Sequence, residues 1–557
     1  MFSRVLIANR GEIAVRVART CRELGVGTIA VFSDVDERAR HVTACDEAVR
    51  LPGVAPSETY LNLDAVIAAA RSSGAQAVHP GYGFLSERAD AARAVAEAGL
   101  VWVGPPPEAT AAVGDKIHAR RLAEQAGVPV VPGTAEPVGS VEEVLAFGEL
   151  HGYPVAIKAS GGGGGRGFRV VMTPGDAEDA LAAAAREAEA AFGSPDVYLE
   201  RYLSAPKHVE VQILGTGPGD VLWLGARDCS LQRRHQKLTE ETPPPLHAGL
   251  VPELGEAAAA VAKACGYVNA GTVEFLVDED GSFFFLEVNA RLQVEHTITE
   301  EVLGVDLVAA QLRIAAGDDL DFAGPDLEPR GHAIECRINA EDPARSFAPT
   351  PGRITAYREP GGPGVRVDSG YNEGDEVPGA YDSLIAKLIV WARTREEARL
   401  RMLRSLDEFV IEGVATTIPA HRALLRHPTF VDGSYTTRTV EEGALASLEP
   451  PVSGEPDRHV LVVGGRPVRL WHPAIGAAAT GAAPAGSGGV VVSPMHGTVI
   501  DVLVKQGDEV RQGDPVAVLE TMKMETRVEA AVAGTVTSVN IESGAVVESG
   551  EVIATIS

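Results

Sequence analysis

Lys523 is the residue of this 557-residue sequence whose surroundings most clearly indicate chemistry. It lies in the run Glu520-Thr521-Met522-Lys523-Met524-Glu525, near the junction of an internal repeat. The segment from Gly497 aligns with the segment from Gly534, at an offset of 37 residues (534 minus 497). A lysine displayed where two β-rich halves meet is a candidate attachment point for a swinging cofactor. The alternative is a solvated hairpin residue, but an exposed pair of methionines beside it would have no packing purpose.

A pair of acidic strands predicts a metal site. Glu274 lies in one apolar run, and Glu287 and Asn289 lie in the next, with the turn Asp278–Gly281 between them. Strand alternation places Glu287 and Asn289 on one face, and the turn brings Glu274 opposite Glu287. Two buried carboxylates repel each other unless a cation lies between them, and hard oxygen ligands suit Mg²⁺. The alternative is that each carboxylate pairs with a local Arg or Lys.

Two polar clusters add acid–base chemistry. The run Arg291–His296 directly follows the second acidic strand, and a further cluster occupies Gln232–Lys237. Arg291 and Lys237 can neutralise a small anion, and Glu295 can act as a general base beside it. Taken singly, such charges are more often solvated surface residues, so the prediction depends on their occurring together.

Five consecutive glycines in the run Gly161–Gly167 form a loop whose backbone N–H groups can approach an anion closely. Lys158 supplies a positive charge on the preceding strand. A flexible surface turn is the alternative, but a turn does not need five glycines. We therefore expect a phosphate-covering flap between two antiparallel strands.

The elements that must position these residues follow from hydrophobic periodicity. In the first part, the pattern predicts strands alternating with helices, which is typical of an α/β, mostly parallel sheet. These elements are strands 4–8, 28–32, 77–79 and 101–103, and helices 12–24, 63–71 and 90–98. A second part, 114–203, carries the glycine flap and an alanine-rich helix over 176–192. A third part, 204–446, is β-rich, with strands predicted at 209–214, 272–277, 283–288, 333–339 and 384–390.

Composition limits the function classes. The chain has 49 basic and 77 acidic side chains, a formal net charge of −28, which disfavours binding to nucleic acid or anionic membranes. The N-terminal apolar run is too short for a signal peptide, and we find no candidate membrane span. Five scattered cysteines without a CxxC pair favour a reducing, cytoplasmic location. Residues 473–490 are an Ala/Gly/Pro linker, and 447–472 contain two short strand-like runs, 459–463 and 468–471.

Five motifs, in order along the chain, resemble biotin carboxylase, a member of the ATP-grasp enzymes. They are Ile7–Ile13, His79–Glu87, Gly161–Gly167, Gln232–Lys237 and Glu287–His296. Met522-Lys523-Met524 on a duplicated β-module resembles a biotin carboxyl carrier domain. The whole chain is similar to the α subunit of an acyl-CoA carboxylase. The resemblance implies a Rossmann-like N-terminal part (1–113), an ATP-grasp lid (114–203), a β-rich C-terminal part (204–446) and an all-β flattened barrel (491–557).

The resemblance also implies residue roles. The ATP site would contain Lys116, Lys158, Gly163, Gly164, Gly165, Glu200, Leu203, His208, Gln232 and His235. The Mg²⁺ ligands, with Mn²⁺ as an alternative ion, would be Glu274, Glu287 and Asn289. Bicarbonate would bind Lys237, Arg291, Gln293, Val294 and Glu295. The catalytic residues would be Glu295 (the base for bicarbonate), Arg337 (stabilising the biotin enolate), Lys237 and Arg291, and biotin would be attached to Lys523.

The implied reaction uses ATP and bicarbonate to carboxylate biotin. A biotin protein ligase would attach the biotin, and a separate carboxyltransferase β subunit would pass the carboxyl group to an acyl-CoA, so we expect a hetero-oligomer. The β subunit would select among acetyl-, propionyl-, longer acyl- and methylcrotonyl-CoA. We expect pyruvate carboxylase to be excluded by length, because its transferase lies on the same chain. The alternatives are another ATP-grasp ligase with a lipoyl-like carrier, and an inactive carrier or scaffold.

Overall fold

The N-terminal part is built on a parallel sheet, as the alternating pattern predicts. In the computed structural model the strand order is β3-β2-β1-β4-β5, and every pair is parallel. The elements are β1 (Arg4–Ile7), α1 (Gly11–Glu23), β2 (Gly27–Phe32), α2 (Arg40–Ala44), β3 (Glu47–Arg50), α3 (Leu63–Ser72), β4 (Ala77–His79), α4 (Ala89–Glu97) and β5 (Val101–Trp102). The edge strand β3 was missed because its sequence, Glu-Ala-Val-Arg, lacks an apolar run.

The structure describes residues 1–134, 136–159, 168–192, 194–217, 219–234, 236–245, 249–322, 327–446, 448, 459–463, 466–470, 489–493, 497–521, 524–547 and 551–557. The glycine run with Gly163, Gly164 and Gly165, the nucleotide residue His235, most of the predicted linker and Lys523 therefore lie outside the described residues. Within the described part, no helix is long and apolar enough to cross a membrane.

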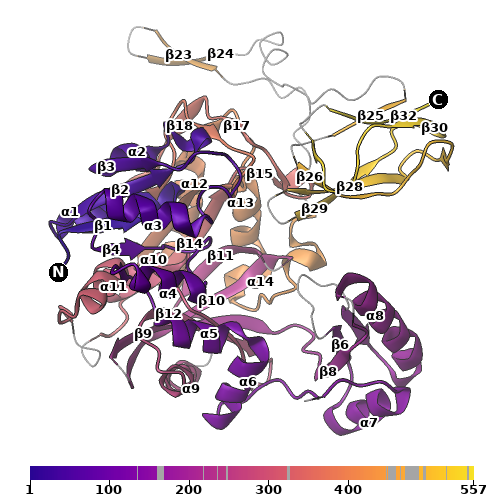
Figure 1. Ribbon diagram of the computed structural model, residues 1–557, viewed down its shortest axis with the longest axis horizontal. Coiled ribbons are helices and arrows are strands. Elements are labelled where there is room, and N and C mark those ends of the chain that lie inside the picture. The colour runs from indigo at the N-terminus through magenta and orange to yellow at the C-terminus, as the bar shows by residue number, and fades with distance from the viewer. Residues whose placement is uncertain are drawn as a thin grey trace.

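A separate small layer forms the lid. Its three-stranded sheet, β7-β6-β8, packs against two helices around its own core, which includes Val144, Ile157 and Leu199. The elements from the end of the first sheet are α5 (Pro107–Gly114), α6 (Lys116–Gln125), α7 (Val141–His151), β6 (Val155–Ala159), β7 (Phe168–Val171), α8 (Ala177–Phe192) and β8 (Val197–Arg201). Figure 1 shows α7, α8, β6 and β8 projecting together at one end of the molecule, whereas α6 packs on the central part.

An eight-stranded antiparallel sheet is the centre of the molecule. Its order is β13-β12-β9-β10-β11-β14-β21-β19. The strands are β9 (Lys207–Gly217), β10 (Asp220–Arg233), β11 (Gln236–Thr242), β12 (Asn269–Val277), β13 (Phe283–Asn289), β14 (His332–Asn339), β19 (Val365–Ser369) and β21 (Leu384–Ala392). The helices around it are α9 (Leu250–Ala264), α10 (His296–Leu303), α11 (Leu307–Ala316), α12 (Arg395–Glu408), α13 (Ile418–Arg426) and α14 (Pro428–Asp432).

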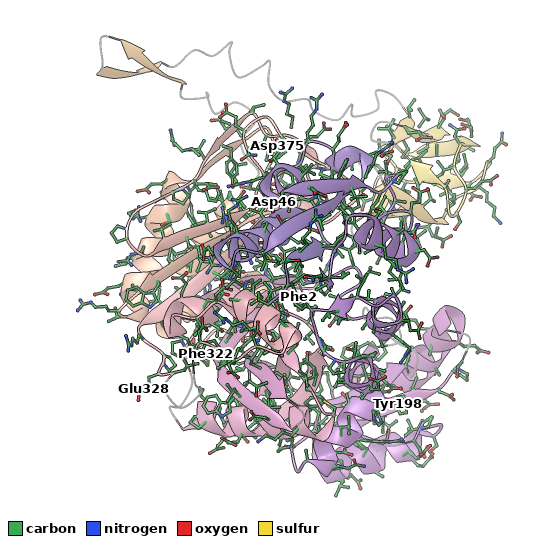
Figure 2. The ribbon with its side chains drawn as sticks, turned by 60° about the vertical axis from the view of Figure 1, so that its left-hand side comes forward. Phe2, Asp46, Tyr198, Phe322, Glu328 and Asp375 are labelled. Carbon is green, nitrogen blue, oxygen red and sulfur yellow. The ribbon has the colours of Figure 1, made fainter. Side chains whose placement is uncertain are left out.

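Short strand pairs complete this region: β15 (Glu341–Asp342) with β16 (Ala348–Pro349), β17 (Gly352–Arg353) with β20 (Glu376–Val377), and β18 (Ala356–Arg358) with β22 (Val410–Glu412). The central and N-terminal parts share one core, in which Val5 and Ile13 pack with Leu214 and Leu307. Phe2 and Phe322, both labelled in Figure 2, pack against this core from the two parts.

The C-terminal module confirms the repeat. Two four-stranded sheets, β25-β32-β30-β27 and β29-β28-β26-β31, enclose a core whose described members all belong to the module. The strands are β25 (Val490–Val492), β26 (Gly497–Val502), β27 (Glu509–Val510), β28 (Pro515–Thr521), β29 (Met524–Glu529), β30 (Gly534–Val539), β31 (Val546–Val547) and β32 (Val552–Ile556). The bounds of β26 and β30, and of β27 and β31, differ by the 37 residues of the sequence repeat. Before the module, β23 (His459–Val463) pairs with β24 (Arg466–Leu470), which confirms two strands there.

Candidate active site

A row of charged residues crosses four neighbouring strands of the central sheet. Glu287 on β13 pairs in register with Glu274 on β12, Glu274 pairs with Glu210 on β9, and Glu210 pairs with Arg227 on β10. The predicted turn between β12 and β13 therefore brings Glu274 opposite Glu287. Because paired residues share a face of the sheet, three carboxylates lie side by side. Because neighbouring carboxylates repel each other, this row is stable only if cations lie beside it.

Lys237 is the cation that contacts the largest number of these carboxylates within the described residues. Its Nζ atom lies 2.6 Å from Glu210, 2.9 Å from Glu274 and 2.8 Å from Glu295. Burial by itself lowers the pKa of Lys237, but the carboxylates of Glu210, Glu274 and Glu295 raise it well above its usual value. The ammonium is therefore the fixed positive centre of the site.

Glu295 connects Lys237 to Arg337. One carboxylate oxygen accepts from Lys237, and the other accepts from Nη2 of Arg337 at 2.8 Å. Burial raises the pKa of Glu295, yet Lys237 and Arg337 together hold that pKa well below its usual range. The side chain is ionised at neutral pH and can accept a proton.

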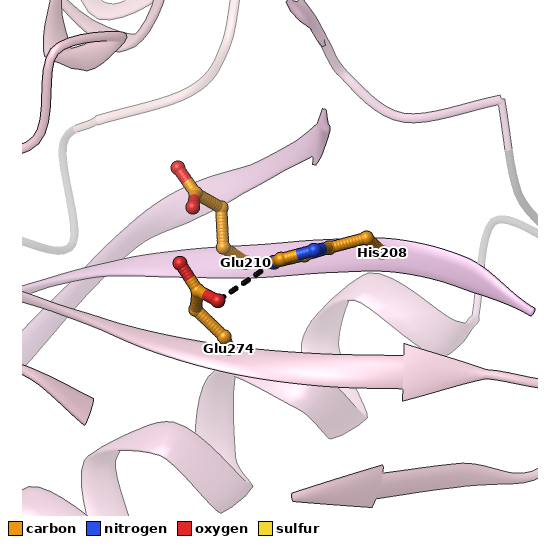
Figure 3. Close-up of side chains that lie close together, drawn as sticks. All are labelled: His208, Glu210 and Glu274. Carbon is orange, nitrogen blue, oxygen red and sulfur yellow. Dashed lines mark ion pairs between the residues drawn. The ribbon is translucent and has the colours of Figure 1, made fainter. Parts of the chain in front are cut away.

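His208 and Glu210 extend the cluster toward the predicted phosphate side. Nε2 of His208 lies 2.8 Å from Glu274, and Figure 3 shows this ion pair, with the side chain of Glu210 on the same side of the sheet. These three residues could hold a metal ion by their spacing. However, both carboxylates already have cationic partners, since Lys237 contacts Glu210 and Glu274 and Arg227 also contacts Glu210.

The predicted magnesium ligands fit a hard cation. Glu274, Glu287 and Asn289 present oxygen atoms from two paired strands, which is the donor chemistry that Mg²⁺ prefers. Burial, and then the neighbouring carboxylate of Glu274, raise the pKa of Glu287, so this pair gains from a cation between its members. The alternative of pairing with local cations is also visible, because Glu274 contacts Lys237 and His208, and Nζ of Lys116 lies 3.7 Å from Glu287.

Arg291 organises the loop between β13 and α10. Its guanidinium donates to Gln293 at 2.9 Å and to Asn289 at 3.1 Å, and it lies 3.3 Å from Glu87. Gln293 in turn reaches Glu274 at 3.4 Å. The predicted bicarbonate residues Lys237, Arg291, Gln293, Val294 and Glu295 are thus brought together around one loop.

The predicted nucleotide residues of the lid form a second group. Glu200 contacts Lys158 across β6 and β8, and it accepts from Arg120 at 3.2 Å. Leu203 packs with Val131 and Phe284. Gln232, near the end of β10, lies opposite Lys237 in register and so belongs to the cluster around Lys237.

Sequence reasoning missed several residues of the site. They are Glu210, Arg227, Cys229, Glu240 and Lys387. Arg227 is fully buried and donates to Glu210 at 2.6 Å, and Glu240 accepts from Nε of Arg337 at 2.6 Å. One signal was available: Lys387 is the only charged residue in the otherwise apolar strand Leu-Ile-Ala-Lys-Leu-Ile-Val-Trp-Ala.

Comparison with known proteins identifies the family. Four family models match: "Biotin carboxylase, N-terminal domain" over 1–110, "Carbamoyl-phosphate synthase L chain, ATP binding domain" over 115–323, "Biotin carboxylase C-terminal domain" over 335–442 and "Biotin-requiring enzyme" over 489–556. The biotin-dependent acyl-coenzyme A carboxylase alpha3 subunit of Mycobacterium leprae is 45% identical over 100% of this chain and 98% of its own. The chain belongs to the biotin-dependent acyl-CoA carboxylase α subunits.

Other relatives match the carboxylase part alone. A pyruvate carboxylase subunit of Methanothermobacter thermautotrophicus is 49% identical over 79% of this chain and 90% of its own. A crystal structure of the biotin carboxylase domain dimer of Hydrogenobacter thermophilus 2-oxoglutarate carboxylase, in complex with MgADP, ADP and bicarbonate, has a TM-score of 0.73 and 46% identity over 80% of this chain and 98% of its own. The prediction that length excludes pyruvate carboxylase is wrong, because a pyruvate carboxylase can be divided into subunits.

Membership in this family fixes the reaction class. The carboxylase is an ATP-dependent ligase that carboxylates biotin, and its carrier module holds that biotin covalently. ATP, Mg²⁺ and biotin are its cofactors and substrates. All five cysteines of the carboxylase are free thiols.

Proposed function

We propose that the buried cluster around Lys237 is where bicarbonate is activated, and that the chain acts as the α subunit of a two-subunit acyl-CoA carboxylase. The observation that carries this proposal is the contact of one carboxylate, Glu295, with both Lys237 and Arg337. A base between two fixed cations suits deprotonation of a bound anion and stabilisation of the charge that develops.

The residues around Lys237 would act on bicarbonate in the following order. Lys237, Arg291 and the loop Gln293–Glu295 hold bicarbonate, and Glu295 accepts its proton. The bicarbonate oxygen then attacks the γ-phosphorus of ATP, the bond to ADP breaks, and carboxyphosphate forms. Carboxyphosphate divides into CO₂ and phosphate within an enclosed site, where water would otherwise consume it.

Two further groups of residues support phosphoryl transfer. Glu274, Glu287 and Asn289 would hold Mg²⁺, which neutralises charge on the phosphates. Lys116, Lys158, His208, Gln232, His235 and the Gly163–Gly165 loop would contact the nucleotide, with Glu200 and Leu203 on the adenine side. Phosphate released from carboxyphosphate would take the proton of the biotin ureido nitrogen, which would then bond to CO₂, and Arg337 would neutralise the charge on the ureido oxygen.

We also propose the division of labour along the chain. Residues 1–446 would form the carboxylase, made of 1–113, 114–203 and 204–446, and residues 491–557 would form the carrier, with biotin on Lys523. The short segment 447–472 and the linker 473–490 would connect them. The separate core of the carrier module supports this division, since a module with its own core can move on a tether.

Partners and location complete the proposal. A biotin protein ligase would modify Lys523, and a separate β subunit would transfer the carboxyl group to an acyl-CoA in a hetero-oligomer. The acyl-CoA substrate is favoured over a 2-oxo acid because the relative named for acyl-CoA matches the whole chain, whereas those named for pyruvate and 2-oxoglutarate match about four fifths of it. The free cysteines fit a reducing compartment, and we propose the cytoplasm.

Three measurements test the proposal. Protein made with a biotin ligase should give a streptavidin signal that disappears in Lys523→Ala, and it should release ADP in a bicarbonate-dependent manner with free biotin. A streptavidin signal that survives Lys523→Ala would contradict the attachment site. Absence of bicarbonate-dependent ADP release would favour the inactive scaffold. Co-purification of the β subunit, assayed with acyl-CoAs and with pyruvate, distinguishes the two substrate classes.

A further inference from the structure

Two sequence motifs have no role in the proposed reaction. Ile7–Ile13 follows β1, and His79–Glu87 follows β4, which is the neighbouring parallel strand. Both motifs therefore lie at the same edge of the first sheet. Asn9 joins them, because its Nδ2 atom donates to the carbonyl of Pro80 at 2.7 Å and to that of Tyr82 at 2.8 Å. Together they form one platform, which we name the N-terminal platform.

The N-terminal platform reaches the bicarbonate loop through one buried lysine. Lys387, on β21, is 0% exposed, and its Nζ atom lies 3.2 Å from Glu12 of α1. The same Nζ donates to the backbone carbonyl of Val294 at 2.9 Å. The Tyr82 hydroxyl donates to the same oxygen of Glu12. Lys387 therefore connects both motifs to the residue that precedes Glu295.

The buried ion pair between Lys387 and Glu12 costs free energy of folding. A buried ammonium loses its hydration and must recover that loss from a few fixed partners. Burial raises the pKa of Glu12 to about 7 although Lys387 lies beside it, and the second carboxylate oxygen of Glu12 is buried with no hydrogen-bond partner among the described residues. A well-packed apolar pair would be at least as stable at such a place. What an apolar pair cannot supply is the hydrogen bond to Val294.

The position of Val294 matters because the next residue is Glu295. Glu295 immediately precedes the first turn of α10, and its carboxylate contacts both Lys237 and Arg337. Fixing the carbonyl of Val294 fixes the peptide that joins Val294 to Glu295. Glu87 makes a second contact from the N-terminal platform, to Arg291 at the other end of the loop. The loop is thus held at both ends.

We propose that Lys387, oriented by Glu12, is a positioning residue that aligns Val294 and Glu295 for bicarbonate. This inference rests on the proposed function, in which the loop Gln293–Glu295 binds and deprotonates bicarbonate. Lys387 touches no reacting atom and acts through the backbone of Val294. A small misplacement of a substrate-binding loop is enough to lower the rate strongly.

The test uses the full-length biotinylated chain and ADP release with free biotin. Lys387→Met leaves Glu12 buried without its cationic partner, so it combines a loss of stability with the loss of the contact to Val294. The double variant Lys387→Met/Glu12→Gln removes the unpaired charge as well. We expect the double variant to recover most of the melting temperature that Lys387→Met loses. Its KM for bicarbonate should nevertheless stay about 10- to 100-fold above that of the wild type, while its KM for ATP changes less than about twofold.

A matched control uses the other buried ion pair of the first motif. Arg10 donates to Asp36 at 2.7 and 2.8 Å, and both side chains are buried, at 3% and 2% exposure. Arg10→Met/Asp36→Asn should leave the ratio of the two KM values unchanged. A wild-type KM for bicarbonate in Lys387→Met/Glu12→Gln, or the same rise in the control, would overturn the inference. An inactive wild-type enzyme would instead overturn the proposed function, and this inference with it.

Discussion

Glu240 and Glu241 are neighbours on β11 whose carboxylates experience opposite environments. Glu240 is 0% exposed, and burial raises its pKa from 4.5 to about 8 despite the hydrogen bond from Arg337. For Glu241, burial also raises the pKa, but hydrogen bonds from His332 and Arg395 outweigh it and lower the pKa to about 2. Replacing either residue by Gln removes one titratable group and nearly preserves the shape of the side chain.

The expected effect of Glu240→Gln on stability depends on pH. Between pH 4.5 and 8 the unfolded chain has lost the Glu240 proton while the folded chain retains it, so wild-type stability falls as pH rises. Gln does not titrate. Over the roughly 1.5 units from about pH 5.5 to about pH 7.0, at about 1.4 kcal/mol per unit, the variant should gain up to about 2 kcal/mol relative to wild type. For a cooperative unit of about 450 residues, that gain is about 2 °C in melting temperature.

The assay is differential scanning of both proteins at several pH values, with the difference in melting temperature plotted against pH. Glu335, whose pKa burial raises to about 7, is present in both proteins, so its contribution largely cancels. Glu241→Gln is the control: it should melt below wild type by a constant amount over the same pH range, because Glu241 stays ionised in both states above 4.5. A flat or falling difference for Glu240→Gln would refute the reasoning.

Four further predictions concern activity and metal dependence. Glu295→Gln should reduce bicarbonate-dependent ADP release by about 10²- to 10⁴-fold, because the proton acceptor is lost, with little change in nucleotide binding measured by calorimetry. Lys237→Met should both stop that release and lower the free energy of unfolding by about 3 to 5 kcal/mol in denaturant titration, since three carboxylates lose their shared cation. Lys158→Met should raise the KM for ATP about tenfold without changing the KM for bicarbonate. EDTA should stop ADP release and excess Mg²⁺ should restore it, whereas recovery without added metal would contradict a role for Glu274 and Glu287 as ligands.

Local sequence patterns predicted those parts of the fold that depend on local contacts. The 37-residue repeat anticipated the matching bounds of β26 and β30, and the turn Asp278–Gly281 anticipated the pairing of Glu274 with Glu287. In both cases the residues that determine the local structure lie within a few tens of positions of one another in the sequence. The register of a hairpin is set by its turn and by alternation, and a single sequence contains both.

The remaining site residues depended on contacts between distant segments. In β9, His208, Glu210 and Gln212 alternate with valines and isoleucine, a pattern that normally indicates a solvated face. The structure buries that face, because Arg227 joins Glu210 to Thr299 of α10. Similarly, nothing local distinguishes Glu240 from Glu241. Which carboxylate receives two strong donors is decided by Arg395 and His332, more than ninety residues away in sequence.

The central sheet has a consequence for how such enzymes can be recombined. One family match ends at residue 323 and the next begins at 335, yet β11 on one side of that boundary is hydrogen-bonded to β14 on the other. The boundary therefore separates two stretches of one continuous sheet, with Lys237 on the first and Arg337 on the second. A chimera that exchanges only one stretch must form a new pairing between β11 and β14. It must also restore the contacts of Lys237 and Arg337 with Glu295. If residues 207–392 are exchanged as one block, β11 and β14 come from the same parent protein and their pairing is preserved.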